Sequence, residues 1–450
     1  MYQDHPIQIV KNAIHLVQSV LSNIYYGFPA RNLKILAVTG TDGKTTTTLM
    51  LYHVLKESGH RVGYISTISA KVNERELDTG LHVTTPDPWM VPKYLKLMRE
   101  EKIEYVILEA TSNGLQQNRL WGIPLSGAII TNIKSDHLDY HRTWANYAKA
   151  KLRIVKMLNP GATLVLNKDD NKSYNWIRKS IRDKSNLNIT SISQVDVQDV
   201  KYSINGIDFR LNGVEFSLNL IGKFNLQNAL EVISLASNFV DLKMIAKALS
   251  TFTPPKGRME IIQKEPFTVI IDFAHTPNSL QNALKCINDL RSANQKLIAV
   301  YGCAGKRDKK RREMGKVSAR LADITILTSE DPRNENLEDI NNEIINYAVK
   351  EGGEVLVRFK NHQEFRASNI ENIKESLAHP RVHPIIAFDE NSIRSRQDAI
   401  SLAVNLAKAG DIVYITGKAH EKSMAFGANE EEFPWSEHRE VRAALNKQIA

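Results

Sequence analysis

The sequence predicts an α/β protein built from two α/β domains, a central one with a mostly parallel sheet and a Rossmann-like one after it. Short apolar strands alternate with amphipathic helical segments along the chain, which is typical of parallel sheets with crossover helices. The chain has 450 residues, too many for one ordinary core, because most domains run to roughly 100–200 residues. Polar clusters also follow many of the strands, where ligands sit in open parallel sheets.

Composition excludes several classes of protein. Hydrophobic residues make up 42% and charged residues 24%, which is ordinary for a globular chain and excludes a disordered, collagen-like or coiled-coil protein. No apolar stretch approaches the ~18–20 residues that span a bilayer, and the N-terminus lacks the pattern of a signal peptide. Cys286 and Cys303 are too few for a disulfide framework or a four-sulfur zinc site. We therefore expect a cytoplasmic protein with no membrane partner.

The net charge of +9 suits either a nucleic acid or an acidic, phosphorylated small molecule. No basic stretch is interleaved with aromatic residues, as binders of single strands require. The one dense basic cluster, residues 306–312, follows a strand and a glycine turn, which favours a binding site over a basic tail. We expect a monomer that binds acidic small-molecule substrates and no nucleic acid.

The elements follow in order from the hydrophobic pattern. Residues 7–24 form an amphipathic helix, and Ile7, Val10, Ile14, Val17 and Leu21 recur at helical spacing. We expect this apolar stripe to pack on the central domain. Apolar strands are predicted at residues 34–38, 105–108, 128–133, 163–166, 269–272, 297–301, 324–327, 384–388 and 412–415, with helices between most of them, such as 46–58 and 278–290.

Two further patterns set the domain organisation. Alternating polar and apolar residues over about 190–220 predict exposed antiparallel strands that extend the first sheet. The segment Thr253-Pro254-Pro255-Lys256-Gly257 is the strongest linker signal. The predicted organisation is a short N-terminal helical segment (1–33), a central domain (34–254) and a C-terminal domain (255–450).

A glycine loop joins the first predicted strand to the next helix, with the sequence Gly40-Thr41-Asp42-Gly43-Lys44-Thr45-Thr46. Backbone N–H groups of such a loop cradle phosphates at a helix N-terminus. Lys44 would reach the terminal phosphates, and the Thr45 hydroxyl would bind Mg²⁺. The two glycines lie closer together than in the common pattern, and glycine turns also follow strands in plain Rossmann folds. Gly-Lys-Thr at this junction nevertheless favours a nucleoside triphosphate site, so the central domain is predicted to be a P-loop domain.

Two other strand ends carry candidate magnesium ligands. Glu109 ends a buried apolar strand, and His137 follows the next predicted strand. Alone, a strand-end glutamate can cap a turn, and a single histidine is usually structural. Together with a phosphate loop, these residues become candidate ligands of Mg²⁺.

The ordered motifs resemble those of the Mur ligase family, which joins an amino acid to a carboxylate with ATP. The resemblance is strongest to the branch that adds the third peptide residue, and it covers roughly residues 34–445. Besides the phosphate loop it rests on Thr84-Thr85-Pro86-Asp87-Pro88 and on residues 109–119, 131–141, 147–154, 222–228, 257–260, 272–277, 302–308 and 417–421.

The resemblance implies that ATP phosphorylates a substrate carboxylate and that an incoming amine then displaces the phosphate. It makes Lys44, Lys151 and His137 catalytic, with Lys151 at the position of a carbamylated lysine that approaches a second Mg²⁺. Burial would lower the pKa of a lysine and favour its reaction with CO₂. Without the resemblance, Lys151 is an exposed helix lysine like Lys149 and Lys156.

The remaining site residues also come from the resemblance. It implies that the nucleotide is bound by residues 40–46 together with Asn228, Arg258 and Asp272. It implies magnesium ligands at Thr45, Glu109, His137 and Lys151. It implies that the acceptor substrate touches Thr84, Thr85, Thr111 and Arg119. It implies that the incoming amino acid is bound by Arg307, Asp331, Arg333, Gly417 and Glu421.

Three departures from the family pattern affect the expected substrates. Asn113 stands where the branch usually has His. The diaminopimelate signature Asp-Asn-Pro-Arg reads Glu330-Asp331-Pro332-Arg333, so the retained arginine favours an amino acid with a second carboxylate, and Asp331 leaves open which one. The phosphate loop begins at residue 40, so the N-terminal uridine-binding domain of the family is missing from this sequence.

The function expected is that of an ATP-dependent ligase that adds a diaminopimelate-like amino acid or lysine to a muramoyl-dipeptide-type precursor in peptidoglycan synthesis. A folylpolyglutamate synthase-like ligase is the first alternative. Its loop normally carries Gly-Lys-Gly, and it lacks the Thr-Thr-Pro-Asp-Pro segment. A nonenzymatic ATP-binding subunit is the second. The retained Glu109, His137, Lys151, Arg307, Arg333 and Glu421 argue against it.

Overall fold

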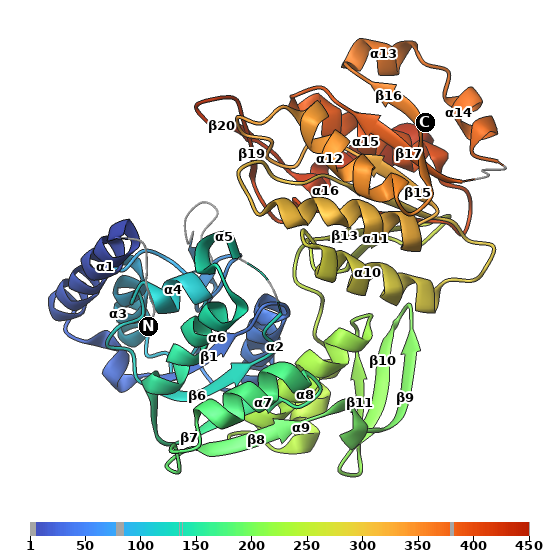
Figure 1. The fold of residues 1–450 in the computed structure, drawn as a ribbon. Coiled ribbons are helices and arrows are strands. Elements are labelled where there is room, and N and C mark those ends of the chain that lie inside the picture. Colours follow the sequence, from blue (N-terminus) through green and yellow to red (C-terminus); the bar gives the residue numbers. More distant parts are fainter. Residues whose placement is uncertain (1–5, 78–84, 135, 137, 379–381, 450) are drawn as a thin grey trace. The chain divides into compact units, whose positions relative to one another are not determined.

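A computed structural model describes residues 6–77, 85–134, 136, 138–378 and 382–449 (Figure 1). The chain divides into two compact units, unit 1 over Met1–Thr253 and unit 2 over Pro254–Ala450. Each unit holds a large, mostly parallel sheet with helices on both of its faces, which confirms the predicted α/β class.

The sheet of unit 1 has eight strands in the order β4-β3-β2-β5-β1-β6-β7-β8. Six neighbouring strands, β2, β5, β1, β6, β7 and β8, run parallel to one another. Beside β2, the strands β3 and β4 add an antiparallel edge. The strands are β1 (Lys34–Thr39), β2 (Val62–Ile65), β3 (Ala70–Val72), β4 (Arg75–Leu77), β5 (Tyr105–Glu109), β6 (Leu125–Ile130), β7 (Leu158–Asn167) and β8 (Asn188–Ile192).

Alternate residues of β1 face two separate cores, because successive side chains of a strand point to opposite faces. Leu36 and Val38 pack against helices α2, α8 and α9, whereas Ile35 and Ala37 pack against α3, α4, α6 and α7. These helices are α2 (Lys44–Glu57), α3 (Met90–Glu100), α4 (Ser112–Gln116), α6 (Trp144–Leu152), α7 (Asn171–Ser180), α8 (Lys223–Ala236) and α9 (Leu242–Ser250), and the short elements η1 (Pro29–Asn32), α5 (Leu138–His141), η2 (Arg153–Met157) and η3 (Gln194–Asp196) join them.

The expectation that the alternating segment adds antiparallel strands to the first sheet is wrong, because β8 joins that sheet in parallel and the remaining strands do not join it. β9 (Gln198–Ser203), β10 (Gly206–Leu211) and β11 (Val214–Leu218) form a separate three-stranded antiparallel sheet. Phe209 and Phe216 on its inner face join the core that covers α2 and α8, so this small sheet packs on helices. Only β8 joins the large sheet, and the capping box of Ser193 ends the strand there.

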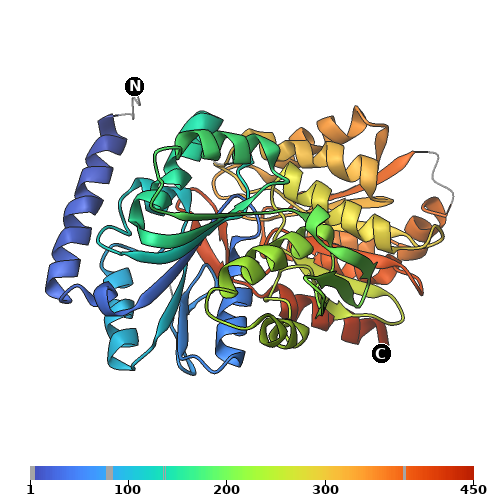
Figure 2. The ribbon, with the colours of Figure 1, turned by 90° about the horizontal axis from the view of Figure 1, so that it is seen from below.

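Helix α1 (Pro6–Tyr25) lies along the edge of unit 1, as Figure 2 shows, and it is turned opposite to the expectation. Val10, Ile14, Val17 and Leu21 remain 50–57% exposed. The polar residues Ser19, Ser22 and Asn23 are instead buried, and they hydrogen-bond backbone carbonyls of unit 1. The prediction that the apolar stripe packs on the central domain is therefore wrong for these four residues, because the polar side of the helix makes the contacts.

Unit 2 holds a seven-stranded sheet in the order β12-β13-β18-β14-β15-β17-β16, in which only β12 is antiparallel. Its strands are β12 (Glu260–Gln263), β13 (Thr268–Asp272), β14 (Leu297–Tyr301), β15 (Ile324–Leu327), β16 (Gly353–Phe359), β17 (His383–Phe388) and β18 (Ile412–Thr416), and a separate hairpin is formed by β19 (Ser423–Phe426) and β20 (Glu431–Pro434). The helices are α10 (Pro277–Leu290), α11 (Met314–Leu321), α12 (Leu337–Val349), α13 (His362–Ala367), α14 (Ile370–Ser376), α15 (Ile393–Leu406) and α16 (Glu437–Ile449), and η4 (Lys309–Glu313) precedes α11.

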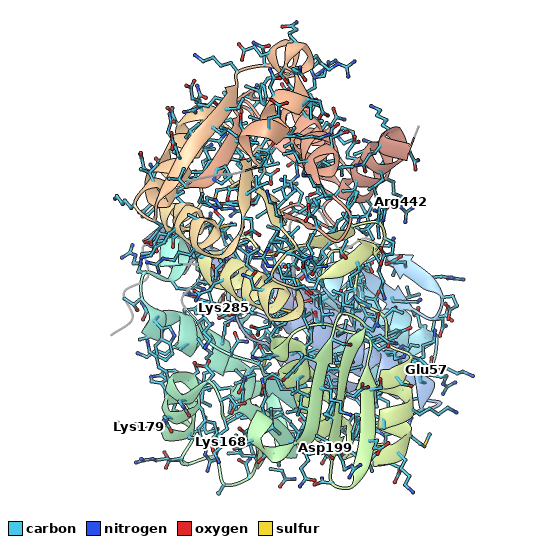
Figure 3. The ribbon with its side chains drawn as sticks, turned by 90° about the vertical axis from the view of Figure 1, so that its right-hand side faces the viewer. Glu57, Lys168, Lys179, Asp199, Lys285 and Arg442 are labelled. Carbon is cyan, nitrogen blue, oxygen red and sulfur yellow. The ribbon has the colours of Figure 1, made fainter. Side chains whose placement is uncertain are left out.

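Two surface observations bear on partners. Among the described residues, no helix has both the length and the apolar character that crossing a bilayer requires. Basic side chains are spread over both units, among them Lys168 and Lys179 of unit 1 and Lys285 and Arg442 of unit 2, as labelled in Figure 3. Acidic side chains such as Asp199 are interspersed with them.

Candidate active site

The glycines of the phosphate loop are required by close contacts. A Cβ on Gly40 would lie 1.8 Å from the hydroxyl oxygen of Thr131. Gly43 has a φ of +84°, and a Cβ there would lie 2.4 Å from Oδ1 of Asn228. Only glycine fits both positions, because the first lacks room and the second also needs the left-handed conformation. Asn228 on α8 thus lies directly against the loop.

Residues after β6 hold the phosphate loop in place. The Thr131 hydroxyl donates to the Asp42 carbonyl at 2.7 Å, and the Asp42 N–H donates to Oδ1 of Asn132 at 3.0 Å. The Lys44 ammonium donates to the Thr41 carbonyl at 2.8 Å, so it folds back over the loop. The loop leads into the fourteen-residue helix α2, whose first N–H groups have no intrahelical acceptor and favour an anion.

Glu109 ends β5 and is fully buried beside this helix. The Thr45 hydroxyl donates to both of its carboxylate oxygens, at 3.0 and 3.1 Å. Thr67 donates to the same carboxylate through its N–H and its hydroxyl, at 3.0 and 2.8 Å. The structure therefore brings together two of the predicted magnesium ligands, Thr45 and Glu109.

A magnesium ion fits this pair of residues in kind, because hydroxyl and carboxylate oxygens are its usual protein ligands. The third candidate, His137, lies outside the described residues. Within the described parts of the chain there is no group of three or more His, Cys, Asp or Glu side chains that could hold a metal.

Lys151 on α6 is 1% exposed, whereas Lys149 and Lys156 are exposed. Its ammonium nitrogen hydrogen-bonds the Gly40 carbonyl of the phosphate loop and lies 4.5 Å from the ring centre of Tyr147. Burial and the neighbouring charge of Lys44 lower the pKa of Lys151 well below its usual value, against the opposing effect of nearby carboxylates. The reading of Lys151 as an exposed surface residue is therefore excluded.

The predicted acceptor residues cluster at the start of α4. The hydroxyls of Thr85 and Thr111 lie 2.9 Å apart, and the Thr111 N–H donates to the Thr85 hydroxyl at 3.0 Å. Arg119 donates to the Thr85 carbonyl at 2.9 Å and to Oε1 of Gln117 at 2.8 Å. The structure brings Thr85, Thr111 and Arg119 together, and Thr84 lies outside the described residues.

Of the two predicted nucleotide residues of unit 2, Asp272 ends β13 and Arg258 lies just before β12. Asp272 accepts hydrogen bonds from the Met259 N–H at 3.1 Å and the Tyr414 hydroxyl at 2.7 Å. The guanidinium carbon of Arg258 lies 4.5 Å from the ring centre of Phe273. Arg258 and Asp272 are therefore close together, because the neighbour of each residue contacts the other.

Asp331 and Glu421 are joined by a lysine that sequence reasoning missed. The ammonium of Lys418 lies 2.8 Å from Oδ1 of Asp331 and 2.6 Å from Oε2 of Glu421, and its side chain is fully buried. Burial would lower the pKa of Lys418, but the two carboxylates outweigh it and hold the pKa above its usual value. Lys418 lies within the segment 417–421 that resembles the family, yet nothing in the sequence distinguishes it from a surface lysine.

Arg333 and Arg307 lie near one acidic side chain. Arg333 donates to the Gly305 carbonyl at 3.0 Å, and its Nε is 3.5 Å from Oε2 of Glu430. A hydrogen bond from Lys306 lowers the pKa of Glu430, and the charges of Lys306, Arg333 and Arg307 add to this effect. The predicted amino-acid residues Arg307 and Arg333 thus share one neighbourhood.

Gly417 lies against the buried carboxylate of Glu330. Gly417 has a φ of +111°, and a Cβ there would lie 2.7 Å from Oε2 of Glu330. Burial raises the pKa of Glu330 to about 7, against the charges of Arg311, Arg396 and Lys418. Gly417, Asp331 and Glu421 are therefore brought together around Glu330 and Lys418.

Comparison with known families gives two matches. The family described as Mur ligase middle domain matches residues 38–236, and the family described as Mur ligase, glutamate ligase domain matches residues 257–419. The two matches cover most of unit 1 and most of unit 2.

Two curated relatives carry the same name. The UDP-N-acetylmuramoyl-L-alanyl-D-glutamate–2,6-diaminopimelate ligase of Clostridium tetani (strain Massachusetts / E88) is 32% identical over 431 residues, which is 94% of this chain and 79% of that protein. The ligase of the same name from Parabacteroides distasonis is 32% identical over 416 residues, 92% of this chain and 78% of that protein.

Solved structures share the fold. A UDP-N-acetylmuramoyl-L-alanyl-D-glutamate–2,6-diaminopimelate ligase matches with a TM-score of 0.60 and 25% identity, over 98% of this chain and 83% of that one. The folylpolyglutamate synthase of Mycobacterium tuberculosis, complexed with ADP and AMPPCP, matches with a TM-score of 0.65 and 17% identity, over 86% of this chain and 95% of that one. At that identity the second match shows the fold alone.

Proposed function

The chain belongs to the Mur ligase family of ATP-dependent amino-acid ligases, and from this premise we propose that it adds 2,6-diaminopimelate to the D-glutamate carboxylate of a muramoyl dipeptide in peptidoglycan synthesis. The names of the curated relatives support this choice of substrates. The observation that carries the proposal is the buried set of Thr45, Glu109 and Lys151 around the phosphate loop. A binding subunit that had lost its chemistry would not need these buried polar side chains.

ATP is the phosphoryl donor in this proposal. The loop 40–46 would cradle its phosphates, and Lys44 would exchange the Thr41 carbonyl for the terminal phosphate. Asn228, Arg258 and Asp272 are proposed to contact the rest of the nucleotide. Thr45, Glu109 and His137 would hold Mg²⁺, which neutralises charge on the transferred phosphoryl group when it is bound.

We assign Lys151 to a carbamate. Its lowered pKa provides the neutral amine that attacks CO₂, and the proton released by the amine leaves the buried site. Carbamylation would replace a cation with an anion beside Lys44. The carbamate nitrogen would keep one N–H, which could still donate to the Gly40 carbonyl.

The acceptor carboxylate attacks the terminal phosphorus of ATP, and ADP leaves. Thr85, Thr111 and Arg119 are proposed to orient the acceptor together with Thr84. The amine of the second substrate then attacks the acyl carbon, and phosphate leaves as the amide forms. This division assigns unit 1 to activation of the carboxylate.

The amino acid is proposed to bind unit 2 through Arg307, Arg333 and the group around Lys418. Arginine forks onto carboxylates, and carboxylates bind an ammonium group. Lys418 offsets the charge of Asp331, so this aspartate can occupy the position of an asparagine without repelling a distal carboxylate. The pairing favours diaminopimelate over lysine, because lysine lacks the carboxylate that Arg333 would bind.

A panel of acceptors crossed with amino acids tests the proposal, with ADP release and product mass as the measurements. We expect turnover only with a muramoyl dipeptide and diaminopimelate. The Lys44→Ala variant serves as the inactive control, because losing an electrostatic group of this kind costs roughly 3–4 kcal/mol of transition-state stabilisation. Turnover with lysine instead would contradict the assigned amino acid, and turnover with a folate and glutamate would favour a folylpolyglutamate synthase-like activity.

A further inference from the structure

Helix α1 presents an apolar stripe to solvent that no described element covers. Val10, Ile14, Val17, Leu21 and Ile24 are each at least half exposed. Near the end of the stripe, Tyr25 is 74% exposed and its ring centre lies 6.1 Å from that of Trp89. Apolar patches of this extent on a protein surface mark interaction sites.

The helix cannot bury this stripe by rolling onto unit 1. Gln8 donates to the Tyr140 hydroxyl at 2.5 Å, and Asn23 donates to the Trp121 carbonyl at 3.0 Å. The hydroxyls of Ser19 and Ser22 donate to the carbonyls of Asn118 and Pro88, both at 2.8 Å. These bonds lie near both ends of the helix and fix its polar side inward, so the stripe is held in place before any partner arrives.

The spacing of the stripe identifies the kind of partner. The steps from residue 10 to 14, 17, 21 and 24 alternate between four and three, and Ile7 continues the series in the sequence. This is a period of about 3.5 residues, which keeps a seam facing another helix in a coiled coil. A helix that packs on a sheet or a broad core shows a wider stripe with a period of 3.6.

The charges of the residues beside the seam limit which partner helices can pair with α1. The positions that flank the seam are Lys11, Ala13, Gln18, Val20 and Tyr25, and only one of them is charged. Two copies of this helix can therefore meet without like-charge repulsion in either direction. The same lack of basic residues argues against an anionic membrane, whose amphipathic helices are rich in Lys and Arg.

We propose that α1 of one copy of this chain pairs with α1 of a second copy, in a two-fold symmetric dimer. The twenty-residue helix is ~30 Å long. With Trp89, which is 37% exposed and contacts Tyr25, a seam of that length approaches the ~1,000 Å² that a specific interface needs. The pre-ordered helix lowers the entropic cost of pairing. This oligomeric state differs from the monomer that the sequence predicts.

Sedimentation equilibrium of the full chain tests the dimer over a wide concentration range. We expect a mass that rises from 50.8 kDa to twice that value as concentration increases. The double variant Val17→Glu/Leu21→Glu should stay at the mass of one chain throughout, with unchanged thermal unfolding. Val195→Glu is the matched control, because Val195 is 83% exposed in η3, and this variant should dimerise like the wild type.

Cysteine cross-linking checks that the seam itself makes the contact. Cys286 and Cys303 are buried, so an added cysteine on α1 is the reactive one. A mixture of the Ile14→Cys and Val17→Cys variants should give a mixed disulfide if the helices are antiparallel, and each variant alone should cross-link if they are parallel. Val195→Cys should give neither product.

Three results would overturn the proposal. One is a wild type that keeps the mass of one chain at every concentration. Another is a double variant that still dimerises, since the contact would then lie elsewhere. The last is co-sedimentation of the wild type with phosphatidylserine vesicles that the double variant loses, because the stripe would then bind a membrane.

Discussion

Lys151 shows how burial decides the chemistry of a single residue. Three lysines lie within eight residues on the chain, and only Lys151 is enclosed beneath the phosphate loop. The sequence alone favours an exposed residue, because a lysine-rich helix end is usually solvated. Periodicity cannot reveal this burial, since the loop that covers Lys151 comes from a distant strand.

Replacing Lys151 by arginine keeps a cation but prevents carbamate formation. We expect ligation to fall by ~100-fold or more, as when a preorganised electrostatic group is removed. The measurement is the ligation rate, together with the carbamate signal after equilibration with ¹³C-bicarbonate. Lys149→Arg on the same helix is the control and should retain both. A fully active Lys151→Arg variant would exclude the carbamate.

Glu330 predicts a pH dependence of stability. Burial raises its pKa from 4.5 to about 7 in the folded chain, so the folded state binds this proton more tightly than the unfolded state. Its contribution to stability is complete below pH 4.5 and is lost as the pH rises through 7. Glu330→Gln should therefore stabilise the protein at pH 8 by about 3 kcal/mol relative to its effect at pH 4.

Chemical denaturation of the two proteins at both pH values measures this difference. The expected sign is a gain for Glu330→Gln that grows with pH. A gain that is equal at both values would mean that Glu330 titrates normally in the folded chain. Glu432→Gln is a suitable control, because Glu432 is exposed on β20.

At the scale of elements, the hydrophobic pattern of a short segment predicts the strands whose burial depends on that segment alone. The buried strands β1, β5, β13, β14, β15 and β18 stand where apolar runs predict them. The strands β9, β10 and β11 form their own sheet instead of extending the large one. Alternation predicts a half-exposed strand, but it does not say which neighbouring strand it pairs with. For helix α1 the sequence predicts the helical period correctly, but it predicts the wrong side of the helix as the buried one. Its serines and asparagine find backbone acceptors that only the folded unit provides.

The two glycines that flank α2 allow a matched test of the phosphate loop. Gly43 and Gly59 both have positive φ, at +84° and +87°, but only Gly43 has a side chain against it. Either change to alanine should cost ~1–2 kcal/mol of backbone strain. Gly43→Ala should also push Asn228 away and weaken nucleotide binding at least tenfold.

Calorimetric titration with a nonhydrolysable ATP analogue measures the binding of both variants. Gly59→Ala should bind like the wild type despite its lower stability. Equal affinity of the two variants would show that the contact of Gly43 with Asn228 does not shape the nucleotide site.

At the scale of the whole molecule, each unit has its own core. The cores of unit 1 cover both faces of its sheet, and a separate core in unit 2 joins its sheet to α15 and α16. The motifs that predict the site are scattered along the chain, and their order predicts which strand ends should carry it. Contacts such as Lys418 with Asp331 could not be predicted, because they depend on how distant segments meet.

Calorimetric unfolding should therefore proceed in two steps, one for each unit. Arg396 and Glu437 form a fully buried ion pair in unit 2, and Arg396 also donates to the Ser329 and Thr416 carbonyls. Arg396→Met leaves the Glu437 carboxylate without its cation and should destabilise unit 2 by ~3–5 kcal/mol. Only the step that belongs to unit 2 should shift to lower temperature.

The pair of Lys374 with Glu371 on α14 provides the control, because the two side chains are 34% and 69% exposed. Lys374→Met should change stability by less than ~1 kcal/mol, because ion pairs at the surface contribute little. A single unfolding step that moves as a whole in Arg396→Met would mean that the two units unfold cooperatively.

The strand order around β1 has a consequence for synthesis of the chain. β1 pairs with β5 on one side and with β6 on the other, so residues 109 and 131, which secure the loop after β1, come from segments made long afterwards. Pairings so distant in sequence form slowly. A growing chain released after β2 would carry the complete glycine motif and yet capture no nucleotide. Nucleotide binding by ribosome-bound chains of increasing length would therefore report when β6, the last of these three strands to be made, has paired with β1.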